Sequence, residues 1–447
     1  MQENHNHAGS AKYQQSQIDP VTLPEPEHHQ IPLDNGLTVH VFPMPWRHEV
    51  GITLLVRAGS RFETAEDSGI AHFLEHMIFK GIERIPDPTD LHTYLESLGA
   101  DMNASTGQET NAYWVTLPPE NMQEGFLTFC EMFTHPAFSD LQTERKIILS
   151  EMREDENDEG EVINSSILSA QMLWPDHPLG RPILGSRESV NAVTVESLRR
   201  FLEQCYTGSN LAIAFFGPVT PDHCVALCKQ ALGGFPAGSP AELQTVPPFT
   251  SGPHWQAVND RNAQLLLTLS FRTAGYHALE RHLLSAIQRV LDDGFASRLQ
   301  AKLREKQGLA YELWAGYQPF SDTGSFELGA SVAPDQLEVV FHALLEQLNQ
   351  LHTHPPDEAE WTRVHNRWRF SLTSALDHPG NLLERFVSDP LFNVQESFSS
   401  AWDHIRHLTP EDIAQSAAQL FKPENMVVTL VGSGATDRID QLKKMIP

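Results

Sequence analysis

The sequence has few cysteines and little positive charge. Its four cysteines, among 447 residues, form no C-x-x-C pair and lie at Cys130, Cys205, Cys224 and Cys228. This spacing gives no indication of a zinc ribbon or a dithiol redox motif, so we expect buried structural thiols. Lysine and arginine number 31 against 58 acidic residues, for a net charge of −27. Such an acidic chain is poorly suited to bind nucleic acid or an anionic membrane surface, and we expect neither partner.

Long apolar runs are absent as well. No segment approaches the roughly 20 consecutive apolar residues of a membrane-spanning helix, and residues 1–18 lack the basic and apolar regions of a secretory signal. We therefore expect a soluble protein of the cytoplasm, or of the periplasm if a signal peptide has been removed. Residues 1–27 carry no apolar period, which predicts a flexible arm. His5 and His7 in this arm could bind a stray metal ion, but a plain polar tail is the simpler interpretation.

The rest of the chain has the composition of a globular protein with two domains. Hydrophobic residues make up 40% of the sequence, and 447 residues exceed what one ordinary core accommodates. Residues 236–252 are rich in proline and glycine and predict a linker between a domain at 28–235 and another at 253–447. A strand followed by a helix is indicated on each side of this linker, at 51–57 and 70–79 and again at 264–271 and 282–291. This repeat predicts an internal duplication of two α+β domains.

His72 and His76 form a candidate metal site. In the segment His72-Phe73-Leu74-Glu75-His76 the two imidazoles stand at i and i+4 of a predicted helix, so they project from one face and can share a tetrahedral ion. Glu75 lies on the adjoining flank, where a carboxylate can act as the general base on a metal-bound water. The order is the inverse of the commoner H-E-x-x-H helix. With 22 histidines in the chain, an H-x-x-E-H motif arises by chance about one time in ten, so the motif alone is only suggestive.

A catalytic zinc ion needs a third protein ligand, and a second predicted helix offers one. Residues 141–153 follow an amphipathic period that places Glu144 and Glu151 seven residues apart on one stripe. Both glutamates could equally be ordinary solvent-facing acids. The residues alone therefore leave the third ligand open.

A series of further motifs resembles one protein family. The motifs are Leu33-Asp34-Asn35-Gly36-Leu37, Ala58-Gly59-Ser60-Arg61-Phe62-Glu63, the run from Gly69 to Gly81, Asn103-Ala104-Ser105-Thr106 and His177-Pro178-Leu179-Gly180. In this order they resemble the pitrilysin/insulinase family of inverted zinc peptidases, and within it the short subfamily that includes the β subunit of the mitochondrial processing peptidase. The resemblance covers nearly everything after residue 28. It implies two domains of similar fold, each a mostly antiparallel sheet packed with helices, that form half of a four-domain clamshell.

The resemblance also implies roles for the two glutamates of the second helix. The family's third zinc ligand falls on Glu151, which completes a set with His72 and His76 for one Zn²⁺ per chain. Glu144 falls on an acidic position that implies a partner for one of the ligand histidines. In such a site Glu75 would activate a zinc-bound water for attack on a peptide bond.

Substrate contacts are implied in both domains. Residues Asp101 to Ser105 correspond to an edge strand that receives an extended peptide, with Asn103, Ala104 and Ser105 as the contact positions. In the second domain, Arg304 and Tyr311 match the family's pair that holds a substrate carbonyl and the developing oxyanion. On sequence alone, a plain edge strand and a core tyrosine would be the ordinary interpretations.

Taken with the resemblance, the sequence predicts a zinc-dependent endopeptidase that hydrolyses short or unfolded peptides inside a closed chamber. Since only two of the four clamshell domains are present, we expect a homodimer with composite sites, or a heterodimer with a related two-domain chain. The glycine-rich loop of the non-catalytic α-type subunits is missing at 291–296. A scaffold subunit without activity is the main alternative, and metal storage is a second one, although the histidines are scattered.

Overall fold

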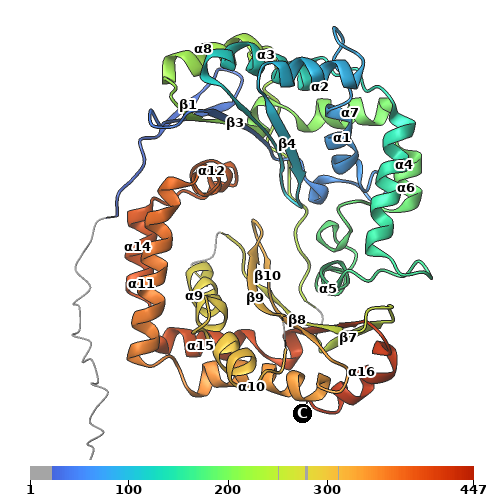
Figure 1. Ribbon diagram of the computed structural model, residues 1–447, viewed down its shortest axis with the longest axis vertical. Coiled ribbons are helices and arrows are strands. Elements are labelled where there is room, and N and C mark those ends of the chain that lie inside the picture. The colour runs from blue at the N-terminus through green and yellow to red at the C-terminus, as the bar shows by residue number, and fades with distance from the viewer. Residues whose placement is uncertain (1–22, 250, 277–279, 311, 447) are drawn as a thin grey trace, which may run out of the picture.

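A computed structural model describes residues 23–249, 251–276, 280–310 and 312–446 of the chain. Two β-sheets lie opposite each other, and helices cover the outer side of each sheet (Figure 1). The α+β class predicted from the sequence is confirmed. Within the described ranges, no helix combines the length and the apolar character needed to cross a membrane.

Each half of the chain forms one sheet. The first sheet has the strand order β1-β2-β6-β3-β5-β4, and the second has the order β7-β11-β8-β10-β9. The strands of the first sheet are β1 (His29–Pro32), β2 (Thr38–Pro43), β3 (Val50–Val56), β4 (Asp101–Thr106), β5 (Asn111–Leu117) and β6 (Leu211–Gly217). Those of the second are β7 (His254–Val258), β8 (Leu265–Thr273), β9 (Glu312–Pro319), β10 (Gly324–Val332) and β11 (Met426–Val431).

The helices are distributed over both halves. The first half contains α1 (Ile70–Ile78), α2 (Pro88–Ser97), α3 (Met122–Thr134), α4 (Leu141–Glu151), α5 (Ser165–Leu173), α6 (Arg187–Ala192), α7 (Val195–Cys205) and α8 (Pro221–Leu232). The second contains α9 (Glu280–Asp292), α10 (Leu337–Thr353), α11 (Glu358–Ser374), α12 (Pro379–Leu383), α13 (Asp389–Leu391), α14 (Phe398–Arg406), α15 (Pro410–Leu420) and α16 (Ala435–Lys443). Two π-helical turns, η6 (Gln300–Lys306) and η8 (Glu384–Ser388), complete the second half.

The two sheets have the same topology. In the first, β2 pairs in parallel with β6, and β6, β3, β5 and β4 then follow in antiparallel pairs. In the second, β7 pairs in parallel with β11, and β11, β8, β10 and β9 follow in the same way. The predicted duplication is therefore present in the fold, with β1 as an addition to the first copy.

Individual residues repeat between the copies as well. Three residues of the first half recur at identical spacing in the second, namely Thr194, Asn210 and Gly217 as Thr409, Asn425 and Gly432. Both glycines have a φ of +136°, and a Cβ on either would lie 2.5 Å from a backbone oxygen at the start of the neighbouring strand. Only glycine fits there without strain, so both copies keep it.

Each half contributes a helical segment to the sheet of the other half. Helix α5 packs on β8 and β11, where the hydroxyls of Ser169 and Ser270 share a hydrogen bond of 3.0 Å. In return, η8 packs on β6, and Phe386 of η8 lies edge-on to Phe42 of β2. Figure 1 shows α5 beside the second sheet and α12, which leads into η8, beside the first. Some apolar residues of the first half, among them Phe42 and Phe216, therefore belong to the core of the second half, while most of the other buried apolar residues of the first half form a core of their own.

A buried ion pair also joins the halves. The fully buried side chain of Arg61 lies 2.6 Å from Glu109 of the first half and 2.7 Å from Asp322 in the β9–β10 turn of the second. Glu109 in addition accepts hydrogen bonds from the backbone N–H of Ser321. This arrangement satisfies the charges that the contact buries and fixes the β9–β10 hairpin against the first sheet.

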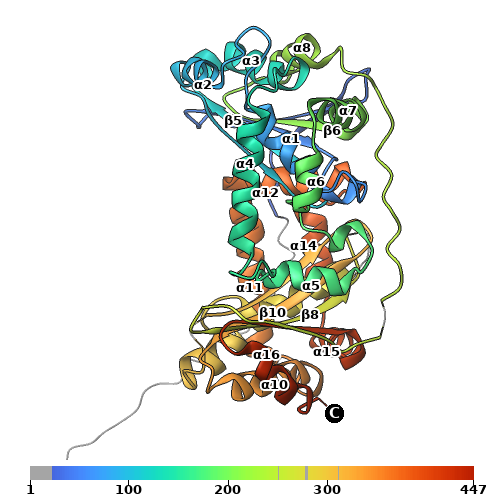
Figure 2. The ribbon, with the colours of Figure 1, turned by 90° about the vertical axis from the view of Figure 1, so that its right-hand side faces the viewer.

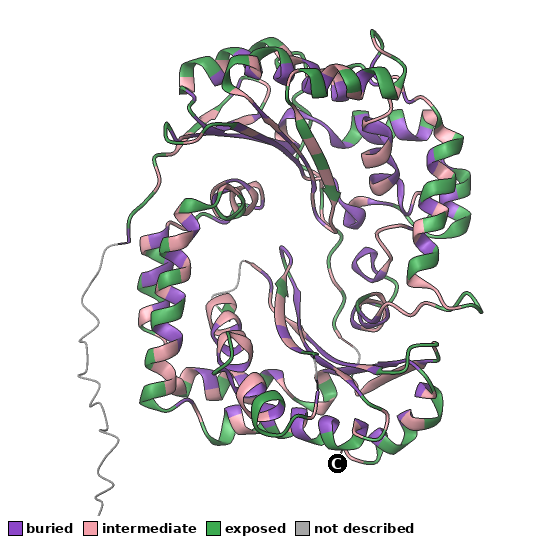
Figure 3. Ribbon diagram, viewed as in Figure 1, coloured by how far each residue is buried: buried purple, intermediate pink, exposed green. Residues whose placement is uncertain are grey.

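The central strands of both sheets are buried, whereas edge strand β4 and the outer helix faces are partly exposed (Figure 3). All four cysteines are buried free thiols, as predicted. Residues 233–249, which follow α8, run along the outside of the molecule (Figure 2). The predicted flexible arm needs correction at its end, because Leu23 is buried and Glu25 accepts hydrogen bonds from the N-terminus of α14. Residues 1–22 lie outside the described residues.

Candidate metal centre

Helix α1 is held in place at its first turn. The carboxylate of Glu63 accepts hydrogen bonds of 2.8 Å from the backbone N–H groups of Gly69 and Ala71. An acidic group at this end of a helix satisfies free donors and complements the helix dipole. Gly69 has a φ of +89°, and a Cβ there would lie 2.5 Å from the backbone oxygen of Leu184. These contacts fix the helix that carries the candidate ligands.

His72 and His76 project from the same face of α1. Their ring centroids are 4.7 Å apart, with an angle of 58° between the ring planes. Burial, and then the neighbouring imidazole of His76, lower the pKa of His72 to about 3. His72 is therefore neutral at physiological pH, and neutral imidazole is the form that binds a metal ion.

Glu151 joins the two histidines from the end of α4. Its Oε2 lies 3.9 Å from Nε2 of His72 and 3.7 Å from Nε2 of His76. This oxygen is buried and has no hydrogen-bond partner in the described structure, although the side chain as a whole is 37% exposed. A buried carboxylate oxygen without a hydrogen-bond partner, facing two imidazoles, is an atom whose charge a bound cation would compensate.

The three side chains fit a zinc ion. Their ligand atoms lie within 4.8 Å of one another. Tetrahedral zinc with bonds of about 2.0–2.2 Å separates neighbouring ligand atoms by about 3.3 Å, so small side-chain rotations suffice. Two imidazoles and one carboxylate are a donor set typical of catalytic zinc, which keeps a fourth position open.

Glu144 contacts the far side of one ligand ring. It is 3% exposed, and its Oε2 lies 3.1 Å from Nδ1 of His76. Its other oxygen lies 2.7 Å from the ammonium group of Lys80. A carboxylate on Nδ1 fixes the tautomer that leaves Nε2 free for a metal. The family resemblance implied this role for Glu144, whereas the contact between Glu144 and Lys80 was not predicted from the sequence.

Glu75 lies beside the ligands and is held by strand β4. Its Oε2 accepts a hydrogen bond from the hydroxyl of Thr106. Thr106 in turn accepts a hydrogen bond of 2.8 Å from the side-chain amide of Asn111, which also donates to the backbone oxygen of Ala71 at 3.2 Å. Burial raises the pKa of Glu75, while the Thr106 hydroxyl and His76 oppose that rise. The roles of Thr106 and Asn111 were missed from the sequence, although Thr106 stands in the quoted motif.

Strand β4 lies at the edge of the first sheet, as predicted, and next to α1. The side chains of Asn103 and Ser105 are exposed. The Oδ1 of Asn103 accepts a hydrogen bond of 2.8 Å from the backbone N–H of Ala104. A peptide that added to this edge at Ala104 would therefore displace the Asn103 side chain.

Of the two residues predicted in the second half, Arg304 stands apart from this cluster. Arg304 is exposed on η6, whereas the candidate ligands lie on α1 and α4 of the first half. Tyr311 lies outside the described residues. The structure thus brings together His72, Glu75, His76, Glu144 and Glu151 within one half of the chain.

The models of two protein families match consecutive parts of the chain. "Insulinase (Peptidase family M16)" matches residues 44–187, the range that holds all five residues of the cluster. "Peptidase M16 inactive domain" matches residues 192–367, which contain no H-x-x-E-H motif.

Similar proteins are known from several bacteria. The chain is 30% identical over 393 residues to an uncharacterized zinc protease of Rickettsia felis, a match that covers 87% of this chain and 94% of that protein. A protease from Helicobacter pylori has a similar structure, with a TM-score of 0.82 and 20% identity over 92% of this chain and all of the other. The periplasmic protease PqqL from Escherichia coli has a TM-score of 0.76 and 23% identity over 95% of this chain but 50% of PqqL. These two structural matches bear on the fold alone.

Proposed function

The chain belongs to the insulinase family, peptidase family M16, and on this premise we propose that it is a zinc-dependent endopeptidase. The metal ligands are His72, His76 and Glu151. The observation that carries this proposal is the buried Oε2 of Glu151, which faces two imidazoles and has no partner among the described residues. Relatives named zinc proteases support the choice of metal.

Glu75 is the general base in the proposed reaction. A zinc ion in this site would supply Lewis-acid activation of water and of the substrate carbonyl. Glu75 takes the proton from the attacking water and gives it to the leaving amine as the peptide bond breaks. Its raised pKa favours this exchange, because a base whose pKa lies nearer neutrality both accepts and returns a proton readily. The Thr106 hydroxyl holds one carboxylate oxygen and so directs the other.

The substrate is a short or unfolded peptide bound in extended form. Strand β4 offers one free edge next to α1, and an extended peptide can add to such an edge by backbone hydrogen bonds. Asn103, Ala104 and Ser105 are the contact positions of this proposal. A folded protein cannot present a strand in this way without local unfolding, so it should be a poor substrate.

We also propose that the active form is a homodimer. The match to PqqL covers nearly all of this chain but half of that protease, so a second copy of this chain could supply what the other half of PqqL supplies. Arg304 and Tyr311 of one copy would then contact the peptide held at β4 of the other. A heterodimer with a related chain is the alternative.

Hydrolysis of a mixed library of quenched fluorescent peptides by the purified chain tests the proposal. The Glu75→Gln variant keeps the metal ligands and removes the base, and a chelator removes the metal. We expect cleavage by the wild type that is lost in both controls. Bound zinc without any cleavage by the chain alone would contradict the proposal as stated and favour a scaffold subunit or one that needs a different partner.

A further inference from the structure

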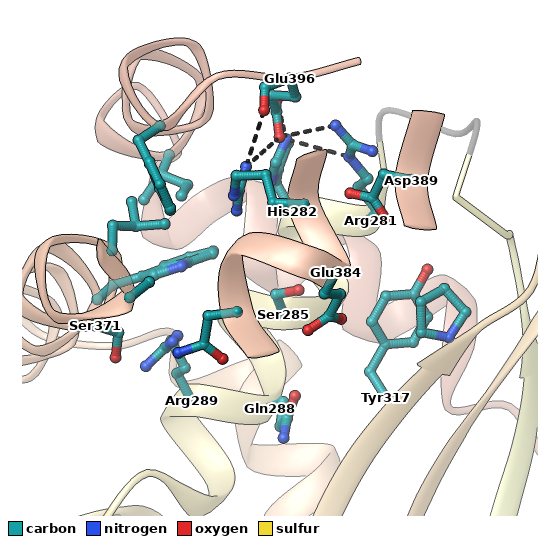
Figure 4. Close-up of a pocket in the computed structure, with 18 of the residues that line it drawn as sticks. Arg281, His282, Ser285, Gln288, Arg289, Tyr317, Ser371, Glu384, Asp389 and Glu396 are labelled. Carbon is teal, nitrogen blue, oxygen red and sulfur yellow. Dashed lines mark hydrogen bonds and ion pairs between the residues drawn. The ribbon is translucent and has the colours of Figure 1, made fainter. Parts of the chain in front are cut away.

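A second group of candidate ligands lies in the half that has no H-x-x-E-H motif. His282 of α9, Glu396 and His404 of α14 place one ligand atom each within 4.8 Å of one another. Glu396 stands in the segment between α13 and α14. Figure 4 shows Glu396 and His282 pointing toward each other at one end of a pocket. Helix α9 follows β8 as α1 follows β3, so one member of this group, His282, lies on the helix that corresponds to the one bearing His72.

The distances in this group suit a metal ion. The Oε1 of Glu396 lies 3.0 Å from Nε2 of His282 and 3.0 Å from Nδ1 of His404. These separations are close to the roughly 3.3 Å between neighbouring ligands of tetrahedral zinc. The first group, with 3.9 Å and 3.7 Å, needs a larger adjustment to reach the same geometry. The donor set, two imidazoles and one carboxylate, is the same in both.

The two carboxylate oxygens of Glu396 have different partners: one contacts the histidines and the other contacts two arginines. Its Oε2 lies 2.8 Å from the guanidinium of Arg281 and 3.4 Å from that of Arg385. A hydrogen-bonded second oxygen is what usually fixes a carboxylate that ligates a metal through the first. Arg281, Arg289 and Arg385 add positive charge to this pocket, and the carboxyl groups of Glu384 and Asp389, which line it as well, oppose that charge.

An ion can reach the group and complete its coordination. The side chain of His404 is 51% exposed, which opens the group to solvent. On the other side, His282 and Glu396 line a cavity of about 510 Å³ that has room for water as a fourth ligand.

We propose that His282, Glu396 and His404 form a second zinc site, separate from the catalytic one. Bound zinc would tie α9 to α14 and to the segment that precedes α14. The alternative is that the two histidines serve only as hydrogen-bond donors to Glu396 in an ion-pair network. The two interpretations predict different numbers of bound zinc ions per chain. This number can be measured without any assay of peptidase activity.

The test starts from the metal-free full-length chain. The number of zinc ions that it binds is measured by calorimetric titration with Zn²⁺ and by metal analysis after dialysis. We expect two zinc ions per wild-type chain. In His404→Gln, the second binding event should weaken by about tenfold or more while the first is unchanged, since one ligand of three is lost. His407→Gln is the matched control, because His407 ends the same helix, is 65% exposed and lies outside the group. It should bind two zinc ions like the wild type.

The converse variant isolates the second site. A His72→Gln/His76→Gln double variant should retain one zinc ion, and adding His404→Gln should abolish it. Retention of two zinc ions by His404→Gln, or a single zinc ion on the wild type, would overturn the proposal. Loss of the second zinc ion on deletion of residues 1–22 would also overturn it, because that segment carries His5 and His7.

Discussion

The carboxylate of Glu144 lies 3.1 Å from Nδ1 of His76, on the side of the ring turned away from Glu151. This contact fixes the tautomer and the orientation of a proposed zinc ligand without touching the metal. We expect Glu144→Gln to weaken zinc binding by about 10–100-fold, as measured by competition with a chromogenic chelator. Glu154→Gln, an exposed acid just beyond α4, is the control. Equal affinities of the two variants would show that Glu144 does not orient His76.

The hydrogen bond from Thr106 to Glu75 predicts a kinetic effect without loss of metal. Thr106→Val keeps the shape of the side chain and removes its hydroxyl. We expect kcat to fall by about tenfold, equivalent to about 1.4 kcal/mol, because Glu75 loses its orientation. KM and zinc affinity should stay near the wild-type values, and Thr106→Ser should restore most of kcat. An unchanged kcat in Thr106→Val would remove Thr106 from the mechanism.

Two variants that are each inactive should regain activity when mixed, if the sites are composite. Glu75→Gln lacks the base, and Arg304→Ala lacks the proposed substrate contact. In a heterodimer of the two, one of the two sites combines an intact Glu75 with an intact Arg304. Random exchange of subunits should therefore restore about one quarter of wild-type activity per chain. No gain after verified subunit exchange would show that the two residues do not meet across a dimer.

Stability should fall as the pH drops below 6.5, because the folded chain holds buried His40 and its half-buried neighbour His28 in neutral form. Burial, followed by the other histidine of the pair, lowers the pKa of His40 to about 3. The unfolded chain takes up a proton near pH 6.5 that the folded chain accepts only near pH 3, so each such histidine costs about 1.4 kcal/mol per pH unit between these values. In urea unfolding between pH 6.5 and 4, His40→Gln should have a smaller slope than the wild type by about one proton. The exposed His223→Gln on α8 should keep the wild-type slope.

The ion pair between the halves makes a separate prediction for stability. Removal of Arg61 leaves the 7%-exposed carboxylate of Glu109 without its charged partner, which should cost about 3–5 kcal/mol in Arg61→Leu. Asp322→Asn should cost about 1 kcal/mol or less, since Asp322 is 37% exposed and Glu109 remains to pair Arg61. Urea unfolding of both variants measures the difference. Similar costs for the two would contradict the assignment of Glu109 as the main partner.

The features predicted correctly from the sequence are those encoded locally. The period of α1 places His72 and His76 on one face, and the period of α4 places Glu144 and Glu151 on one stripe. Local periodicity determines these relations before any tertiary contact forms. Periodicity alone does not tell which of the two glutamates lies near the Nε2 atoms of the imidazoles. The family resemblance identified that residue as Glu151.

Other features depend on how distant segments pack, and the sequence gave no signal for them. Thr106 reaches Glu75 only because β4 lies against α1. Glu396 and His282 are 114 residues apart, and no short motif connects them. The repeat of Thr194, Asn210 and Gly217 at the same spacing in the second half was readable in the sequence but becomes meaningful only once the sheets are aligned.

The exchange of α5 and η8 between the halves has a consequence for biosynthesis. The chain is made from the N-terminus, so the first sheet is complete once β6 has left the ribosome. At that stage Phe42 and Phe216, which line the face later covered by η8, have no cover, because Phe386 is synthesised some 170 residues after Phe216. The nascent first half therefore carries an exposed apolar surface, the kind of surface that makes incomplete folds prone to aggregation. The first half can complete the cover of this face only after η8 has been synthesised.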